Sequence, residues 1–561
     1  MKIVLQLIVI FRVYYIVVTY SSTNALNEDV KKSYLIYNLS GQPGQGYYIT
    51  LYAGTPEQTV NLLVDTGSSN IAIAGVNLTN VDNWFKPNQS STLQCSDTIQ
   101  NVRYEKGYWY GVDCQDYFHF ADHQKTMLPS TAIHNYRIPL SFGLIFNSTK
   151  LFLKHSHSTW YGIIGLGFTS LFVKPHRITN HSQEERTAIF TQLKIQPTKA
   201  KISQPISYLD KLNQFWKISK QFGLLLCGTT LNKNQALNSR QMSGKLLIGQ
   251  MNLSLLLPSD SSSSSSTSLS SGLKMNNFKA SNTYFTPIRK PWYYEIILTN
   301  LIVGNMSLVV NCKELNVDKT IIDSGTTNIY LPKNIFHRLV DVMKVKVNEN
   351  PALAELASKT SFWHGKRAYC LSVTTEDSKL QLYKSFPQIE FHLVSSINTS
   401  NQILSLTFSP QQYVRYLGQI SQHNQSRSCF AFAIQPTHKY SILGSVFLEA
   451  YYTTFDHEKM QIGFSNSPCN AYTNNPNHLV VSKVNGLKHW NHTPHKLASK
   501  TNKIITKRSV IQSPLDCAVY TPTTDEQFAL ITNILTSTIW SSLCLYAVLI
   551  PLLILLNIKF F

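Results

Sequence analysis

The same short pattern occurs twice in this chain of 561 residues. Residues 61–75 read NLLVDTGSSNIAIAG, and residues 320–332 read TIIDSGTTNIYLP. In each copy an apolar run leads to one aspartate, Asp65 or Asp323, and a glycine turn follows. Strand interiors seldom contain Asp. A carboxylate at the end of an apolar strand therefore predicts a functional side chain that the strand holds in a fixed position.

Each copy also has a later companion of two apolar residues and a glycine. The companions are Ile163-Ile164-Gly165 and Ile442-Leu443-Gly444. One Asp-Thr-Gly or Asp-Ser-Gly tripeptide alone is usually an ordinary turn. Two copies of one supersecondary unit predict two lobes related by a pseudo-twofold axis, each bringing one aspartate to a shared site.

A shared site of this kind has definite chemistry. Two adjacent carboxylates do not both ionise readily, so the pair holds one proton in common. One carboxylate accepts a proton from a water held between them, and the protonated one donates to a substrate carbonyl. Gly67 and Gly325 allow close backbone approach and supply N–H donors. Ser68 and Thr326 carry hydroxyls that can hydrogen-bond the carboxylates.

Both ends of the chain carry membrane signals. Residues 1–25 predict a cleaved secretory signal peptide, with an uncleaved anchor as the alternative. Near the other end, Ile534–Ile558 is uncharged and long enough to cross ~30 Å of hydrocarbon. It predicts a transmembrane helix at 531–558 and a cytoplasmic tail of 559–561. A cleaved glycolipid-anchor signal is the alternative.

The body between these signals is predicted to lie outside the cytosol. Asn-x-Ser/Thr glycosylation sequons agree with that compartment: Asn38, Asn77, Asn88, Asn147, Asn180, Asn252, Asn305, Asn398, Asn424 and Asn491. Of nine cysteines, Cys544 lies in the expected membrane span. The other eight predict disulfides, although spacing alone leaves their pairing open: Cys95, Cys114, Cys227, Cys312, Cys370, Cys429, Cys469 and Cys517.

Short strands separated by turn signals predict a mainly β body. The clearest strands are Tyr47–Ala53, Val60–Val64, Ile71–Ala74, Leu246–Ile248, Tyr293–Val303 and Tyr452–Phe455, and the clearest helices are Ala188–Leu193 and Lys333–Val347. We expect a propeptide at 26–44, an N-terminal lobe at 45–225, a C-terminal lobe at 226–470, a disordered serine insertion at 259–271 and a lumenal stalk at 471–530.

The charge pattern excludes some functions. The formal net charge is +20, but the basic residues are scattered and form no long Lys/Arg block. Nucleic-acid binding is therefore not expected. The chain has no Cys-x-x-Cys pair, which argues against a zinc site or a thioredoxin-like redox motif.

The motifs resemble those of the pepsin-type aspartic proteases, and most closely the membrane-anchored β-secretase (memapsin) branch. The matching stretches keep their order: GQGYY, LLVDTGSSNIAIAG, WYGIIGLGF, LLLCGTT, FTPIRKPWYYEIIL, TIIDSGTTNIYLP, SPQQYVRY and FDHEKMQIGF. The resemblance implies a bilobal pepsin-like fold and peptide-bond hydrolysis at acidic pH. It also implies that Asp65 and Asp323 are catalytic and that no metal or cofactor takes part.

The resemblance further implies three disulfides, Cys227–Cys469, Cys312–Cys517 and Cys370–Cys429. Cys95 and Cys114 are additional to that set. We expect a bridge between them across a hairpin, and two free thiols are the alternative.

The family closes a β-hairpin flap over its substrate, and NVRYEKGYWYG at 101–111 matches that flap. The resemblance assigns Tyr104 as the flap tyrosine and Trp109 as its support, while simple packing of both rings is the alternative. Glu105 and Lys106 are charged where the family usually is not. Tyr330 stands where β-secretase-like enzymes usually carry Arg in the substrate cleft, which leaves the substrate preference open.

The expected protein is a single-pass type I membrane protease of the secretory or endosomal pathway or the cell surface. Its expected partners are polypeptide substrates, mostly membrane-anchored, and the lipid bilayer. No Arg-x-x-Arg site occurs between residues 25 and 46, so Lys31-Lys32 is either a dibasic cleavage point or a partner of the aspartate pair. Two other functions remain open: a digestive or lysosomal cathepsin-D-like protease, and an inactive cell-surface binding protein.

Overall fold

The structure is a computed structural model. It describes residues 33–79, 81–104, 107–119, 126–127, 137–149, 159–173, 176–177, 182–198, 206–228, 243–256, 282–309, 311–372, 375–395, 402–422, 425–470, 479–483 and 517. The expected signal peptide, serine insertion, transmembrane helix and tail lie outside these residues. In the part that is described, no helix combines the length and the apolar character needed to cross a membrane.

Strands dominate the described residues. They are β1 Tyr34–Gln42, β2 Gly46–Ala53, β3 Gln58–Asp65, β4 Ile71–Ala74, β5 Gln94–Arg103, β6 Tyr108–His119, β7 Thr126–Met127, β8 Arg137–Thr149, β9 Gly162–Gly165, β10 His176–Arg177, β11 Gln221–Leu226, β12 Gly244–Ile248, β13 Tyr284–Pro287, β14 Leu298–Val303, β15 Met306–Ser307, β16 Thr320–Ile322, β17 Ile329–Pro332, β18 Tyr369–Leu371, β19 Ile389–Val394, β20 Gln402–Phe408, β21 Val414–Gln422, β22 Gln425–Phe432, β23 Ile434–Thr437, β24 Ser441–Leu443, β25 Tyr451–Asp456, β26 Gln461–Asn466 and β27 Leu479–Lys483.

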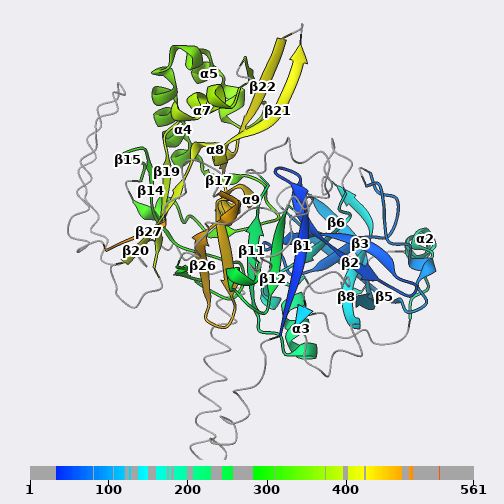
Figure 1. The fold of residues 1–561 in the computed structure, drawn as a ribbon. Coiled ribbons are helices and arrows are strands. Elements are labelled where there is room, and N and C mark those ends of the chain that lie inside the picture. The colour runs from blue at the N-terminus through cyan, green and yellow to red at the C-terminus, as the bar shows by residue number, and fades with distance from the viewer. Residues whose placement is uncertain are drawn as a thin grey trace, which may run out of the picture. The chain divides into compact units, whose positions relative to one another are not determined.

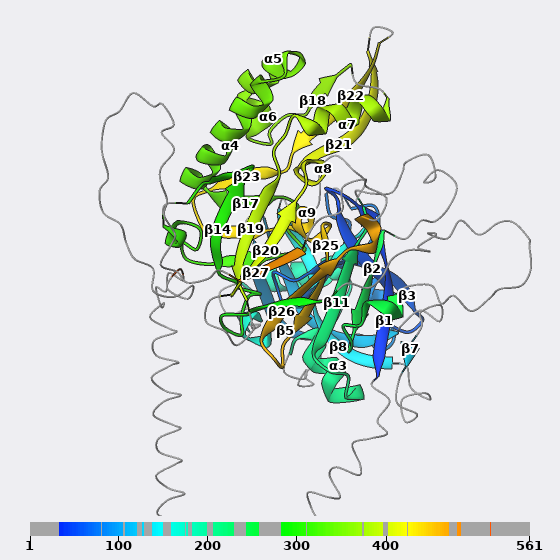
Figure 2. The ribbon, with the colours of Figure 1, turned by 60° about the vertical axis from the view of Figure 1, so that its left-hand side comes forward.

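The helices are short, apart from one in the second half. They are α2 Gln183–Leu193, α3 Tyr208–Trp216, α4 Lys333–Asn348, α5 Ala354–Ser358, α6 Thr360–Trp363, α7 Glu376–Lys384, α8 Pro410–Tyr413 and α9 Ser445–Leu448. Helix α4 lies beside β17 and β23 (Figure 2) and buries Ile335, Phe336, Leu339, Val340 and Met343. It begins directly after Pro332, where the sequence predicts a helix start.

The first copy of the aspartate pattern forms a compact strand unit. Strand β3 ends at Asp65 and pairs in parallel with β9, so that Asp65 lies beside Gly165. The strand that follows the turn, β4, pairs with β9 on its other side in antiparallel fashion. The apolar-apolar-glycine companion thus lies between the strand that delivers the aspartate and the strand that leaves it.

The second copy repeats this arrangement. Strand β16 leads to Asp323 and pairs in parallel with β24, and β17 pairs with β24 in antiparallel fashion. The repeat extends one strand further, because β4 pairs in parallel with β8 and β17 with β23. The two halves therefore contain equivalent units, as two lobes with pseudo-twofold symmetry require.

A single large sheet joins the two halves. Its strand order is β10-β5-β6-β8-β4-β9-β3-β2-β1-β12-β11-β25-β26-β13, with β7 beside β1. Figure 1 shows β26, β11, β12 and β1 side by side in the middle, with β2, β3 and β6 of the first half to the right and the helices of the second half at the upper left. The expected lobe boundary at 225/226 falls inside β11, a strand of this shared region.

Strand β1 is part of the core. Leu35, Tyr37 and Leu39 are fully buried, and β1 pairs with β12 from Leu35 to Leu39. The hydroxyls of Tyr37 and Tyr208 lie 2.7 Å apart. The expected propeptide at 26–44 therefore includes a strand whose apolar side chains fill the interior of the folded protein.

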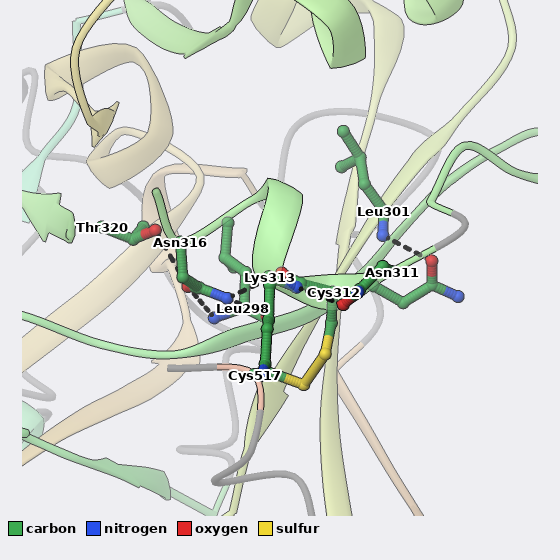
Figure 3. The surroundings of a disulfide bond; sticks show 9 residues. Leu298, Leu301, Asn311, Cys312, Lys313, Asn316, Thr320 and Cys517 are labelled. Atoms are coloured by element: carbon green, nitrogen blue, oxygen red, sulfur yellow. Dashed lines mark hydrogen bonds between the residues drawn. A yellow bond between two sulfur atoms is a disulfide. The ribbon is translucent and has the colours of Figure 1, made fainter. Parts of the chain in front are cut away.

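Among the described residues there are four disulfides: Cys95–Cys114, Cys227–Cys469, Cys312–Cys517 and Cys370–Cys429. These are the pairs expected from the resemblance, together with the additional bridge between β5 and β6. Figure 3 shows the bridge that attaches Cys517 to Cys312, which are 205 residues apart in the sequence. Asn316 supports this place by donating from Nδ2 to the carbonyl oxygens of Leu298 and Cys312.

Candidate active site

Asp65 is held by its own turn. The backbone N–H of Gly67 donates to Asp65 Oδ1 over 2.8 Å, and the hydroxyl of Ser68 donates to Oδ2. Asp65 is only 5% exposed. Both oxygens of the carboxylate are thus fixed by donors from the next three residues.

Asp323 is held in the same way. The backbone N–H of Gly325 donates to Asp323 Oδ1 over 2.8 Å, and Thr326 Oγ1 donates to Oδ2 over 2.6 Å. The sequence analysis expects these four supporting residues, and the structure brings each of them to its aspartate.

The two carboxyl groups meet at one point between the lobes. A Cβ atom added to Gly67 would lie 2.6 Å from Asp323 Cγ, and one added to Gly325 would lie 2.4 Å from Asp65 Oδ1. Real Cβ atoms do not approach other atoms so closely. Each glycine therefore leaves room for the aspartate of the opposite lobe.

Two hydroxyl residues tie the aspartate loops together across the lobes. The N–H of Thr66 donates to Ser324 Oγ over 3.0 Å, and the N–H of Ser324 donates to Thr66 Oγ1 over 2.9 Å. Their hydroxyls donate in turn to the carbonyl oxygens of Ile322 and Val64. This exchange was not expected from the sequence, although a hydroxyl at the same place in both copies was a signal for it.

The electrostatics of the pair follow from this packing. Burial, and then the negative charge of Asp323, raise the pKa of Asp65 to about 8, while hydrogen bonds from Ser68 and Gly67 act in the opposite direction. A carboxyl group with such a pKa keeps its proton in acidic solution. The pair can therefore hold one proton over the acidic range.

A hairpin formed by β5 and β6 brings Tyr104 near Ser68 and Asp65. Tyr104 follows β5, and its hydroxyl accepts a hydrogen bond from Trp109 Nε1 over 3.2 Å. Trp109 itself is fully buried. Burial and the charge of Asp65 raise the pKa of Tyr104, and hydrogen bonds to Trp109 and Ser68 oppose the rise. Glu105 and Lys106 lie outside the described residues.

Tyr330 lies in an apolar cluster on the second lobe. It is 9% exposed and packs with Ile321 and Ile442, and Tyr293 and Tyr440 cover the cluster in part. Burial raises the pKa of Tyr293, and the negative charges of Asp323 and Asp65 raise it further.

Six expected glycosylation sequons fall on described residues, and all six asparagines are exposed: Asn38, Asn77, Asn88, Asn147, Asn252 and Asn305. The other four, Asn180, Asn398, Asn424 and Asn491, lie outside the described residues. Exposure is the condition that attachment of a glycan requires.

Comparison with known proteins agrees with the fold. The model of the eukaryotic aspartyl protease family matches residues 46–198 and 211–467. The chain therefore belongs to the eukaryotic aspartyl proteases, and it is an aspartic-type endopeptidase with the mainly β, bilobal, pepsin-like fold.

Within that family the chain is β-secretase-like. It is 31% identical to a beta-secretase of Strongylocentrotus purpuratus over 455 residues, which cover 80% of this chain and 71% of the relative. It is also 28% identical to plasmepsin VII of Plasmodium falciparum, but over only 27% of this chain and 28% of that relative.

Proposed function

We propose that the chain is a membrane-anchored aspartic endopeptidase that hydrolyses peptide bonds in the ectodomains of membrane or secreted proteins. Asp65 and Asp323 are the proposed acid/base pair, and the reaction runs at acidic pH. The close approach of each aspartate to the glycine of the opposite turn is the observation that supports this role most directly.

The proposed reaction needs one proton shared by the two carboxyl groups. The ionised group takes a proton from a water held between them, and the water oxygen attacks the substrate carbonyl carbon. The protonated group donates to the carbonyl oxygen, which gives a neutral tetrahedral intermediate. The raised pKa of Asp65 supports a protonated member of the pair in acid. Gly67, Ser68, Gly325 and Thr326 keep both groups in position.

Tyr104 and Trp109 are the proposed flap residues. Their mutual hydrogen bond and the proximity of Tyr104 to Ser68 support closure over a bound peptide, which excludes bulk water. Tyr330 is proposed to shape the substrate-binding surface through its contacts with Tyr293, whose pKa is raised by the charges of the carboxyl pair. An aromatic ring in place of a guanidinium favours apolar substrate side chains over acidic ones.

The test is cleavage of a mixed peptide library by the purified full-length protein in detergent, from about pH 4 to about pH 7. Wild type is compared with Asp65→Asn and Asp323→Asn. We expect wild-type activity in acid and a fall in kcat/KM of at least about 1,000-fold in either variant.

The variants replace a carboxyl group by an amide of nearly the same shape, so thermal melting serves as the folding control. Cleavage by a folded Asp323→Asn protein would rule out the paired-aspartate mechanism. A wild-type protein that folds, has lost its propeptide and still cleaves nothing would favour the binding-protein alternative.

A further inference from the structure

A chain of three buried polar side chains connects the flap hairpin with the catalytic loop. Gln100 on β5 donates from Nε2 to Asp113 Oδ1 on β6 over 2.9 Å. Gln100 Oε1 accepts from Asn70 Nδ2, also over 2.9 Å. Asn70 is the last residue of the loop that begins at Asp65. All three side chains are almost completely buried, with exposures of 0% for Gln100, 4% for Asp113 and 1% for Asn70.

Burying these three polar side chains costs free energy. A buried amide or carboxyl group loses its contacts with water, and that loss is offset only by hydrogen bonds of good geometry. An apolar pair across β5 and β6 would avoid the loss, and the neighbouring positions Ile99 and Val112 are such a pair. The polar pair at Gln100 and Asp113 therefore calls for a reason beyond packing.

The position of the chain supplies that reason. Asn70 is held firmly on its other side, because its Nδ2 donates to the carbonyl oxygen of Val173 and its Oδ1 accepts from the N–H of Val173. Its own carbonyl oxygen accepts from the N–H of Gly165, which lies beside Asp65 in the sheet. A displacement of Gln100 is therefore transmitted through Asn70 to β3 and β9, the strands beside the carboxyl group of Asp65.

The flap has a second contact with the same loop at its tip. Tyr104, four residues after Gln100, is near Ser68, and Ser68 donates to Asp65. Trp109, which donates to Tyr104, lies four residues before Asp113. The loop from Asp65 to Asn70 is therefore attached to the hairpin at its tip and again at the base of the flap residues 101–111.

We propose that Gln100 and Asp113 are positioning residues that anchor the base of the flap to the catalytic loop through Asn70. They touch neither substrate nor the reacting atoms. They fix the angle of the hairpin relative to the catalytic loop, and so determine how Tyr104 closes over a bound peptide. The inference rests on the flap and dyad roles proposed above, and it adds two residues that belong to neither.

The main test replaces both members of the pair with apolar residues of similar size, in the variant Gln100→Leu/Asp113→Leu of the full-length protein. Removing both partners leaves no unsatisfied group between them, but one N–H of Asn70 Nδ2 loses its acceptor, so we expect a modest fall in melting temperature and use the melting curve to check that the variant folds. The link to Asn70 is lost. We expect KM and the dissociation constant of a statine-type peptide inhibitor to rise together by about tenfold, with kcat changed by less than about threefold.

Two further variants separate positioning from packing. Asp113→Asn keeps an oxygen that accepts from Gln100 Nε2, and it should restore the wild-type KM. Asp116→Leu is the matched control, because Asp116 is also buried on β6 but is bonded to Ser90 and Thr92, away from the catalytic loop. It should lower the melting temperature and leave KM unchanged.

A readout without catalysis completes the design. Amide hydrogen exchange of residues 101–111 should be faster in Gln100→Leu/Asp113→Leu than in wild type or Asp113→Asn. A wild-type KM in the double variant, or an equal rise of KM in Asp116→Leu, would overturn the inference. Failure of the proposed function would look different, since wild type would then be inactive or Asp323→Asn active, whatever the exchange rates.

Discussion

At the scale of single residues, the site depends on two glycines as much as on the two aspartates. Gly67 and Gly325 matter because each lies where the opposite aspartate must go. The sequence analysis assigned these glycines to close approach and N–H donation, and the contacts have that form. Thr66 and Ser324 were not assigned from the sequence, because the repeat shows a hydroxyl in both copies but not the backbone group that it contacts in the other lobe.

Gly67→Ala tests the close approach directly. The added methyl carbon would lie 2.6 Å from Asp323 Cγ, so the two carboxyl groups must move apart. We expect the protein to fold and kcat/KM to fall by about 100-fold, the usual consequence of displacing a reacting group by about 1 Å. Steady-state kinetics together with a melting curve check this. A folded Gly67→Ala enzyme with wild-type kcat/KM would contradict it.

His457 predicts how stability depends on pH. Its ring stacks on Phe168 at 4.0 Å and contacts the hydroxyl of Tyr294, and burial lowers its pKa to about 4. Asp210 opposes this shift and Lys220 adds to it. A histidine with a lowered folded-state pKa stabilises the protein fully above about pH 6.5, and that stability is lost as the pH falls towards 4. The loss is about 3 kcal/mol.

The variant His457→Gln removes this titration. We expect the difference in unfolding free energy between pH 7 and pH 4 to shrink by about 3 kcal/mol relative to wild type. Urea unfolding of both proteins at the two pH values measures it. If the variant and wild type lose equal stability on acidification, His457 is not responsible.

At the scale of elements, strand positions followed the sequence well where apolar residues alternate or run together. The expected strand at 71–74 coincides with β4, and those at 47–53, 60–64, 246–248 and 452–455 each lie within an observed strand. The expected strand at 293–303 is shortened to β14, because the chain turns at Tyr293, whose carbonyl oxygen accepts from the N–H of Glu295.

Helices were harder to read from the pattern. Helix α2 begins at Gln183 rather than at 188, because Ser182 and Glu185 form a reciprocal capping box ahead of the apolar residues. Helix α3 was not expected, although Ser207 caps it in a similar way. Capping residues carried the missing signal, and periodicity alone did not reveal it.

Strand β1 yields a prediction about maturation. Its side chains fill the core, and it lies between β2 and β12, so its removal would open the core and separate these two strands. We expect the N-terminus of the active enzyme to lie at or before Ser33, and N-terminal sequencing of the purified protein determines it. An active enzyme that starts after Gln42 would contradict this, and Lys31→Ala/Lys32→Ala shows whether the dibasic pair is the cleavage point.

At the scale of the whole molecule, the two lobes form the site, and the proposed anchor holds that site at the membrane surface. The shared sheet brings the aspartate loops together, and the disulfide from Cys312 to Cys517 attaches the region ahead of the proposed anchor to the second lobe. An anchored enzyme meets anchored substrates at a raised effective concentration. Activity towards soluble and anchored substrates should therefore differ.

A truncation after residue 530 tests whether the C-terminal segment anchors the protein in the membrane. We expect the full-length protein to remain with membranes after an alkaline carbonate wash, because the proposal has the uncharged segment Ile534–Ile558 cross the bilayer. The truncated protein should be released, cleave soluble peptides with unchanged kcat/KM and cleave a membrane-anchored substrate more slowly. Release of the full-length protein by the wash would contradict the proposal.

The sequence by itself determined the family and the two lobes, and it predicted which two aspartates form the pair. It could do so because each of these is written in a local pattern that occurs twice. Only the tertiary structure decided what lies opposite each local pattern. Four features depend on contacts between distant segments: the close approach of Gly67 to Asp323, the raised pKa of Asp65, the hydrogen bonds between Thr66 and Ser324, and the hydrogen bond from Asn70 to Gln100. Such contacts depend on how the strands pack, and local propensity carries no record of that.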